Sequence, residues 1–168
     1  MKPSLLFDFT VDKTNNKVHV TREFAAPLEL VWKAWTTAEL LDQWWAPRPY
    51  TNTTVSMNFS NGGRWHYYMT SPEGQKHYCL ADYNDIITEK EFKAIDAFCD
   101  EKGVKQQGFL DSRWHNTFTA EGNTTKVKVE ISYDSLEQLE AIINMGFKEG
   151  FTMGLGNLDE LLESLQKK

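Results

Sequence analysis

Residues 126–165, which decide the fold, read KVKVEISYDSLEQLEAIINMGFKEGFTMGLGNLDELLESL. In the first eight residues, Val127, Val129 and Ile131 alternate with lysine, glutamate and serine, a pattern typical of a strand with one buried face. Asp134 and Ser135 can then cap a helix, in which apolar residues recur at helical spacing up to Leu165. The stretch therefore predicts a strand with an apolar face, followed by one long helix able to cover that face.

The chain before this stretch predicts mainly antiparallel strands. Residues 5–25 read as a hairpin, and residues 26–45 read as two short helices that Pro47 must end. Five further extended segments are expected at 53–59, 64–70, 75–84, 91–100 and 112–119. Short turns separate them, which favours antiparallel pairing. We expect an α+β domain over residues 1–168, in which a curved antiparallel sheet of about six to seven strands surrounds the long C-terminal helix.

Composition and charge exclude several classes of function. The net charge is -6, and no lysine or arginine cluster is longer than the terminal Lys167-Lys168, so we expect neither nucleic-acid nor membrane binding. The N-terminus lacks an apolar run of signal-peptide length, and two cysteines make no disulfide framework, so we expect a cytoplasmic protein with reduced thiols. No phosphate-binding loop, dinucleotide fingerprint or nucleophile elbow occurs, so we predict no cofactor and no catalytic residue.

The sequence resembles the family of activators of Hsp90 ATPase, within the Bet v 1/START-like superfamily of helix-grip proteins. The segments that carry this resemblance are Thr21–Pro27, Val31–Thr36, Trp44–Pro47, Asn61–Trp65 and Gly150–Leu162. The resemblance implies an apolar cavity between the sheet and the C-terminal helix.

The resemblance leaves three functions open. Members of the superfamily bind lipids or other small apolar molecules, and some are cyclases or hydrolases. The eukaryotic Hsp90 activators carry a similar domain after a separate N-terminal domain, for which these 168 residues have no room. We therefore expect binding of a small apolar, lipid- or polyketide-like ligand. The alternatives are a module that binds a protein partner such as a chaperone, and a cyclase- or hydrolase-like enzyme that uses the same cavity.

The expected binding face depends on an assumed turn at Ser71–Gly74. If Thr70 pairs with Gln75 across it, Tyr67 faces Tyr78 and Trp65 faces Leu80. This register also puts His66, His77 and Cys79 on the other face. They could bind zinc there, but no spaced cysteine or histidine motif supports such a site, and we predict no metal. The expected ligand-binding residues are Trp65, Tyr67, Met69, Tyr78, Leu80, Trp114, Asn116, Phe118, Phe147, Gly150 and Phe151.

Four glycines at 146, 150, 154 and 156 punctuate the C-terminal helix, each disfavoured by about 1 kcal/mol relative to alanine. Either they let the helix press onto the aromatic residues of the sheet, or they kink it and leave space for a ligand. In both cases Phe147, Phe151 and Met153 would line that space.

Several other residues leave alternatives open. Asn116 could point inward and either bond a neighbour or anchor the polar end of a ligand. Asp96, at even spacing between Phe92 and Phe98, could be an inward carboxylate with a raised pKa or could face water at a bulge. Adjacent helical residues point about 100° apart, so one of Trp44 and Trp45 should fill the core and the other should shield Pro47 or line the pocket mouth.

Overall fold

The computed structural model describes residues 5–106 and 111–167, and within them all strands belong to one curved sheet. The spatial order is β1-β2-β8-β7-β6-β5-β4-β3, and every neighbouring pair is antiparallel. The strands are β1 (Phe7–Asp12), β2 (Lys17–Phe24), β3 (Thr51–Met57), β4 (Arg64–Thr70), β5 (Lys76–Ile87), β6 (Glu91–Phe98), β7 (Ser112–Glu121) and β8 (Thr124–Ser132). The sheet has eight strands, more than the six to seven expected, because the N-terminal hairpin pairs with β8 and extends it.

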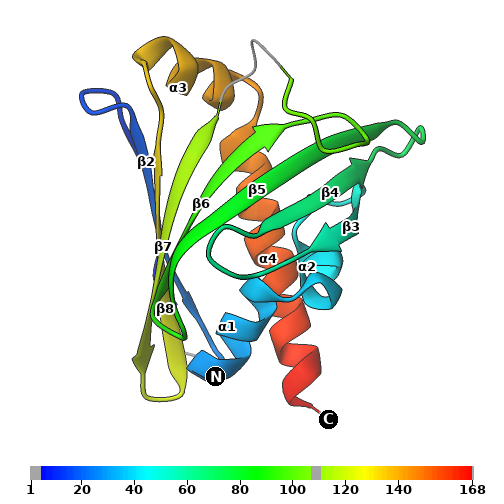
Figure 1. Cartoon of the computed structure of the whole chain (residues 1–168). Helices are drawn as coiled ribbons and strands as arrows, with labels where there is room; N and C mark the ends of the chain where they lie inside the picture. Colours follow the sequence, from blue (N-terminus) through cyan, green and yellow to red (C-terminus); the bar gives the residue numbers. More distant parts are fainter. Residues whose placement is uncertain (1–4, 107–110, 168) are drawn as a thin grey trace.

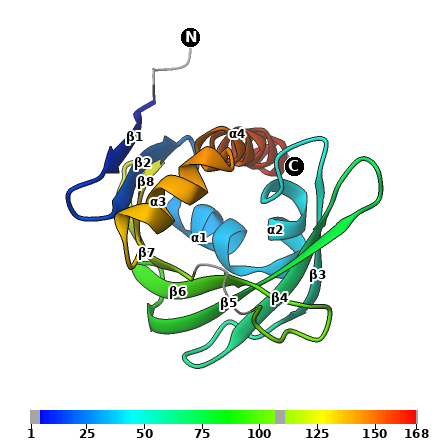
Figure 2. The same cartoon turned by 90° about the horizontal axis from the view of Figure 1, so that it is seen from above.

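Four helices accompany the described part of the sheet, and α4 lies along its concave side (Figure 1). They are α1 (Leu28–Thr36), α2 (Ala38–Trp44), α3 (Leu136–Asn144) and α4 (Phe147–Gln166). Seen from above, the strands curve around α1 and α2, and α4 closes the remaining side (Figure 2). This is the helix-grip arrangement, and the predicted α+β fold class is confirmed.

The alternating strand at the start of the deciding stretch behaves as predicted. Val127, Val129 and Ile131 of β8 are buried, and their register partners on β2 include the buried Val20 and Val18. The lower half of α4 completes this core with Leu155, Leu158 and Leu162, each no more than 2% exposed. Burial of the apolar faces of the sheet and the helix is the main stabilising contribution of this arrangement.

The long C-terminal helix is present as α4, but the prediction that it runs unbroken from Leu136 is wrong, because the helix is interrupted at Met145–Gly146. Gly146 has a φ of 90°, and its backbone N–H donates to the carbonyl of Ile143, which ends α3 with a left-handed glycine. The apolar spacing continues across the break from Ile143 to Phe147, so periodicity alone did not reveal it.

The predicted register of the β4–β5 hairpin is also wrong, by one residue. Thr70 pairs with Lys76, not with Gln75, and Ser71 exchanges backbone bonds with Gln75 and Gly74. Gly74 has a φ of 90°, which permits a three-residue turn where we had assumed four residues. The shift places Cys79 opposite Tyr67 and moves Tyr78 and Leu80 to the outer face.

The upper half of α4 rests on the corner that follows α2. A Cβ atom at Gly154 would lie 3.2 Å from the backbone oxygen of Trp45, and one at Gly150 would lie 3.7 Å from Pro47. Asn157 fixes the same corner, since its Nδ2 donates to the carbonyls of Ala46 (3.0 Å) and Trp44 (3.4 Å). The glycines therefore permit close approach, but to this corner rather than to the aromatic residues of the sheet.

Candidate functional site

A cavity of about 300 Å³ lies between the sheet and the first two turns of α4. Its walls are mainly aromatic, and Trp114 of β7 makes edge contacts with Phe147 and Phe151 at centroid distances of 6.1 and 5.5 Å. Trp45 closes the wall, 5.8 Å from the ring of Trp114. Met145, at the break between α3 and α4, lines the cavity and is 65% exposed, which places the mouth near this break.

The structure brings six of the eleven predicted binding residues together around this cavity. They are Tyr67, Met69, Trp114, Phe147, Gly150 and Phe151. Trp65 and Asn116 instead line a smaller chamber of about 30 Å³ deeper in the molecule. That both sets bind a ligand stays a prediction.

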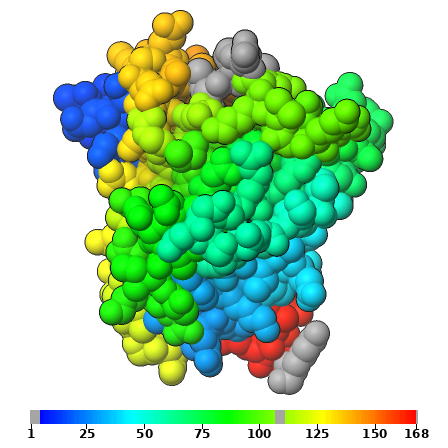
Figure 3. Space-filling model, in the orientation of Figure 1, coloured from blue at the N-terminus to red at the C-terminus, as the bar shows by residue number. Residues whose placement is uncertain are grey.

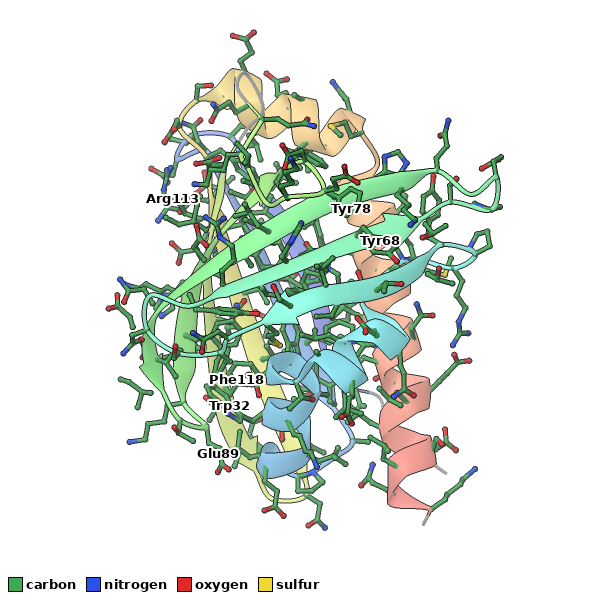
Figure 4. The ribbon with its side chains drawn as sticks, turned by 45° about the vertical axis from the view of Figure 1, so that its right-hand side comes forward. Trp32, Tyr68, Tyr78, Glu89, Arg113 and Phe118 are labelled. Atoms are coloured by element: carbon green, nitrogen blue, oxygen red, sulfur yellow. The ribbon has the colours of Figure 1, made fainter. Side chains whose placement is uncertain are left out.

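Three of the predicted residues lie elsewhere. Tyr78 and Leu80 belong to a small cluster on the outer face of the sheet, because of the register shift. Figure 4 shows Tyr78 beside Tyr68 on the side of the β4–β5 hairpin turned away from α4. Phe118 is buried in the core against Trp32, at a centroid distance of 5.0 Å.

Two predictions for the helices have mixed outcomes. Met153, expected in the cavity wall, is 47% exposed because α4 turns this side chain outward. Trp44 fills the core, as expected for one tryptophan of the pair, and its Nε1 donates to the carbonyl of Ala34 at 2.9 Å. Trp45 takes the alternative position and lines the cavity.

The most unusual group in the wall is the carboxylate of Asp96. Even spacing on β6 points Asp96 inward together with Phe92 and Ala94, and it lies between Ala81 and Ser112 in the register of the sheet. It is partly buried and borders both the cavity and the deeper chamber. Burial raises its pKa from 3.8 to about 7, because desolvation disfavours the charged form.

Tyr67 of β4 is the closest side-chain partner of Asp96. Its hydroxyl donates to Oδ1 of Asp96 at 3.4 Å and accepts a hydrogen bond from Nε1 of Trp45 at 3.3 Å. Both distances exceed the range of about 2.5–3.2 Å that strong hydrogen bonds span. Asp96 also accepts a hydrogen bond from the backbone N–H of Ala97. A carboxylate can accept about four hydrogen bonds, so this bond and the weak one from Tyr67 leave acceptor capacity toward the cavity.

The deeper chamber adjoins three buried polar atoms. Nε1 of Trp35, Nε1 of Trp114 and Oδ1 of Asn116 make no hydrogen bond within the described residues, and all three side chains line the chamber. A space of about 30 Å³ is large enough to hold a water molecule. Buried polar atoms are normally satisfied, so water is the natural partner for these groups.

The zinc alternative finds no support in the side-chain positions. His66 and Cys79 lie on opposite faces of the sheet, because their strands pair one residue away from the assumed register. No group of three or more histidine, cysteine or acidic side chains in residues 5–106 and 111–167 is close enough to hold a metal ion. Within the same ranges, no helix is long and apolar enough to cross a membrane.

A family model described as "Activator of Hsp90 ATPase homolog 1-like protein" matches residues 25–163, which include α1, the whole cavity wall and most of α4. The chain belongs to this family. The family places the protein in the helix-grip superfamily that the sequence segments had indicated. The binding of a chaperone partner, which was one of the alternatives from the sequence, stays a prediction.

Solved structures support the same assignment. Protein Ms6760 from Mycobacterium smegmatis is 28% identical with a TM-score of 0.86, and the match covers 95% of this chain and 97% of that chain. A protein from Arthrobacter aurescens is 25% identical with a TM-score of 0.88, over 94% of this chain and 91% of that one. A protein from Staphylococcus epidermidis is 27% identical with a TM-score of 0.82, over 92% and 94%. A search of curated proteins found no match.

Several residues that line the cavity were not among the eleven ligand-binding residues predicted from the sequence. Asp96 was recognised as a possible inward carboxylate from its spacing, and that interpretation is the one that the structure bears out. Cys79 was missed through the register error. Ser112 and Tyr133, whose hydroxyl groups are hydrogen-bonded to each other, carried no signal beyond their positions at the ends of strands.

Proposed function

We propose that this protein binds a small, largely apolar molecule in the cavity between β4–β7 and the first turns of α4. The observation that carries the proposal is the cavity itself, which at about 300 Å³ falls at the lower end of the usual size of small-molecule sites. Its wall is formed by tryptophan and phenylalanine rings with only a few polar groups, which is the composition typical of such sites.

Native mass spectrometry of the protein purified from cells, and thermal denaturation with a panel of lipids and polyketides, test this proposal. We expect either a bound mass or stabilisation by at least one apolar compound. The absence of any co-purified mass together with no stabilisation across the panel would count against a binding role.

A matched pair of variants ties binding to the cavity. Gly150→Leu places a side chain at the cavity wall, where the nearest atom to its Cβ is Pro47 Cγ at the ordinary contact distance of 3.7 Å. Gly156→Leu adds the same side chain to the same helix where nothing lies within 4 Å of the Cβ, outside the cavity lining. We expect Gly150→Leu to weaken binding at least tenfold and Gly156→Leu to leave it unchanged.

Acid–base catalysis is a second candidate, favoured by the inward carboxylate of Asp96 with Tyr67 as its hydrogen-bonded neighbour. A pKa of about 7 suits a general base at neutral pH. Asp96 would take a proton from carbon beside a ligand carbonyl, and the C–H electron pair would form the enolate. Proton NMR in D2O with 2-tetralone measures this exchange. Acceleration by the protein that Asp96→Asn abolishes would support catalysis, and exchange at the solvent rate would exclude it for this ligand class.

A further inference from the structure

The inner end of the cavity contains a carboxylate without a cationic partner. Asp96 forms no ion pair within residues 5–106 and 111–167, and no lysine, arginine or histidine lines the cavity. Asp111, which precedes β7, is another acid, and its negative charge raises the pKa of Asp96 further. Burial of a carboxylate without a compensating partner is unfavourable, so a partner from outside the chain would be well placed here.

The tyrosine and cysteine side chains around Asp96 are neutral at physiological pH. Tyr67 on β4, Cys79 and Tyr83 on β5, and Tyr133 after β8 all have pKa values raised by burial, and that of Tyr133 is about 12. Within the described cavity wall, Asp96 is therefore the group that changes charge near neutral pH.

The ring positions favour a ligand group that carries positive charge or a polarised hydrogen. Trp45 and Trp114 stand beside the carboxylate in the same cavity wall, 5.8 Å apart. Tryptophan is the aromatic side chain that best accommodates an organic cation. The hydroxyl of Tyr67, at 3.4 Å, and the backbone N–H of Ala97 use only part of the acceptor capacity of the carboxylate, which leaves room for a further donor.

We propose that Asp96 is the acceptor of a recognition site for apolar molecules that carry one hydrogen-bond donor, an amine or a hydroxyl group. The inference rests on the proposed binding function and narrows its ligand class. The apolar body lies among the rings of Trp114, Phe147 and Phe151, and the donor group reaches Asp96 at the inner end. The same carboxylate repels an acidic head group, so fatty acids and other carboxylates are disfavoured.

A series of four naphthalene derivatives with one shared body tests the inference. The compounds are 2-naphthylmethylamine, 2-naphthalenemethanol, 2-methylnaphthalene and 2-naphthoate, and titration is followed by calorimetry at pH 6.0 and 8.0. We expect the amine and the alcohol to bind at least tenfold more tightly than the hydrocarbon, and the carboxylate to bind most weakly. Binding of the amine should strengthen from pH 6.0 to 8.0 as Asp96 ionises, while binding of the alcohol should not.

Two substitutions of Asp96 assign the effect to its carboxylate. Asp96→Asn keeps an acceptor oxygen but removes the charge, so the amine should lose at least tenfold in affinity and the alcohol less than threefold. Asp96→Leu should reduce the affinities for the amine and for the alcohol to that for the hydrocarbon. Asp82→Asn, on the outer face of β5 where the carboxylate pairs with Arg64, is the matched control and should change none of the four affinities.

The outcomes separate this inference from the proposed function. If all four compounds bind equally, or if 2-naphthoate binds most tightly, the donor site is refuted while apolar binding stands. Equal affinities in the wild type and Asp96→Asn for the amine would refute it as well. If none of the four compounds binds and no lipid or polyketide of the broader panel binds either, both the proposed binding function and the inference are refuted.

Discussion

Replacement of Asp96 by asparagine should make the folded protein more stable at alkaline pH and leave its stability at acid pH almost unchanged. In the folded state the pKa of this carboxyl is raised from 3.8 to about 7 by desolvation. Between pH 3.8 and about 7, Asp96 therefore keeps its proton in the folded protein, whereas in the unfolded chain it has already lost it. As the pH rises through this interval, the free energy of unfolding falls, and the loss is complete above about pH 8.

The size of the effect follows from the pKa change. Each tenfold change in an ionisation constant corresponds to about 1.4 kcal/mol, so the full change corresponds to about 4 kcal/mol. Asp96 is partly accessible to water in the cavity, which reduces the penalty, and we take about half, or roughly 2 kcal/mol. For a chain of this length, that corresponds to a difference of about 4–8 °C in Tm.

Urea unfolding followed by tryptophan fluorescence at pH 4.5 and 8.5 measures the effect. The stability of the wild type should fall by about 2 kcal/mol more than that of Asp96→Asn between these pH values. Asp82→Asn, which removes a carboxylate from the outer face, should track the wild type to within about 1 kcal/mol. Parallel pH profiles for the wild type and Asp96→Asn would refute the claim that a desolvated carboxylate lines the cavity.

Four further predictions concern α4 and the break that precedes it, and all are measured by urea unfolding. Gly156→Ala should stabilise the protein by about 1 kcal/mol, since its Cβ meets open space. Gly154→Ala should instead destabilise it by about 1 kcal/mol, since its Cβ would press on the Trp45 backbone oxygen at 3.2 Å; equal effects at both sites would contradict close packing there. Gly146→Ala should lower stability by about 1–2 kcal/mol because alanine is strained at a φ of 90°, and an unchanged midpoint would contradict the helix break. Asn157→Leu should lower stability by about 1–3 kcal/mol because two buried carbonyls lose their donor, and a neutral effect would show that water replaces it.

The fold could be predicted from the sequence because several independent patterns along the chain indicate the same arrangement. The alternation in β8 fixes which face of the sheet is buried, and β2 repeats it with Val18 and Val20. The turns between the later strands are short, and short connections favour antiparallel pairing of successive strands. The family segments, which span most of the chain, pointed to the same arrangement.

The β4–β5 register could not be predicted in the same way. Both faces of this hairpin carry large side chains, with Tyr67 on the inner face and Tyr68 and Tyr78 on the outer face. Hydrophobic alternation therefore gave no preference between two registers that differ by one residue. The observed register depends on the left-handed conformation of Gly74, and the assumed four-residue turn did not include that conformation.

The outer face of β4 and β5 forms a continuous surface over this side of the molecule, so the aromatic residues on it are not part of the cavity (Figure 3). His66, which is 7% exposed, and Leu80 lie in this layer. Composition could not distinguish these aromatic and apolar residues from the cavity wall, because the same residue types serve both.

Whether the aromatic face is packed solid or hollow depends on where α4 is held, and the α2 corner decides this. In its lower half α4 buries Leu158 and Leu162 completely against the core. At the level of Gly154 the helix lies against the backbone of Trp45, since a Cβ atom there would be 3.2 Å from the Trp45 oxygen. The cavity begins just above this contact, since it is lined by Gly150 and Phe147 but not by Gly154. Above the corner, α4 meets the sheet through the rings of Phe147 and Phe151, which contact Trp114, and the cavity lies among these rings.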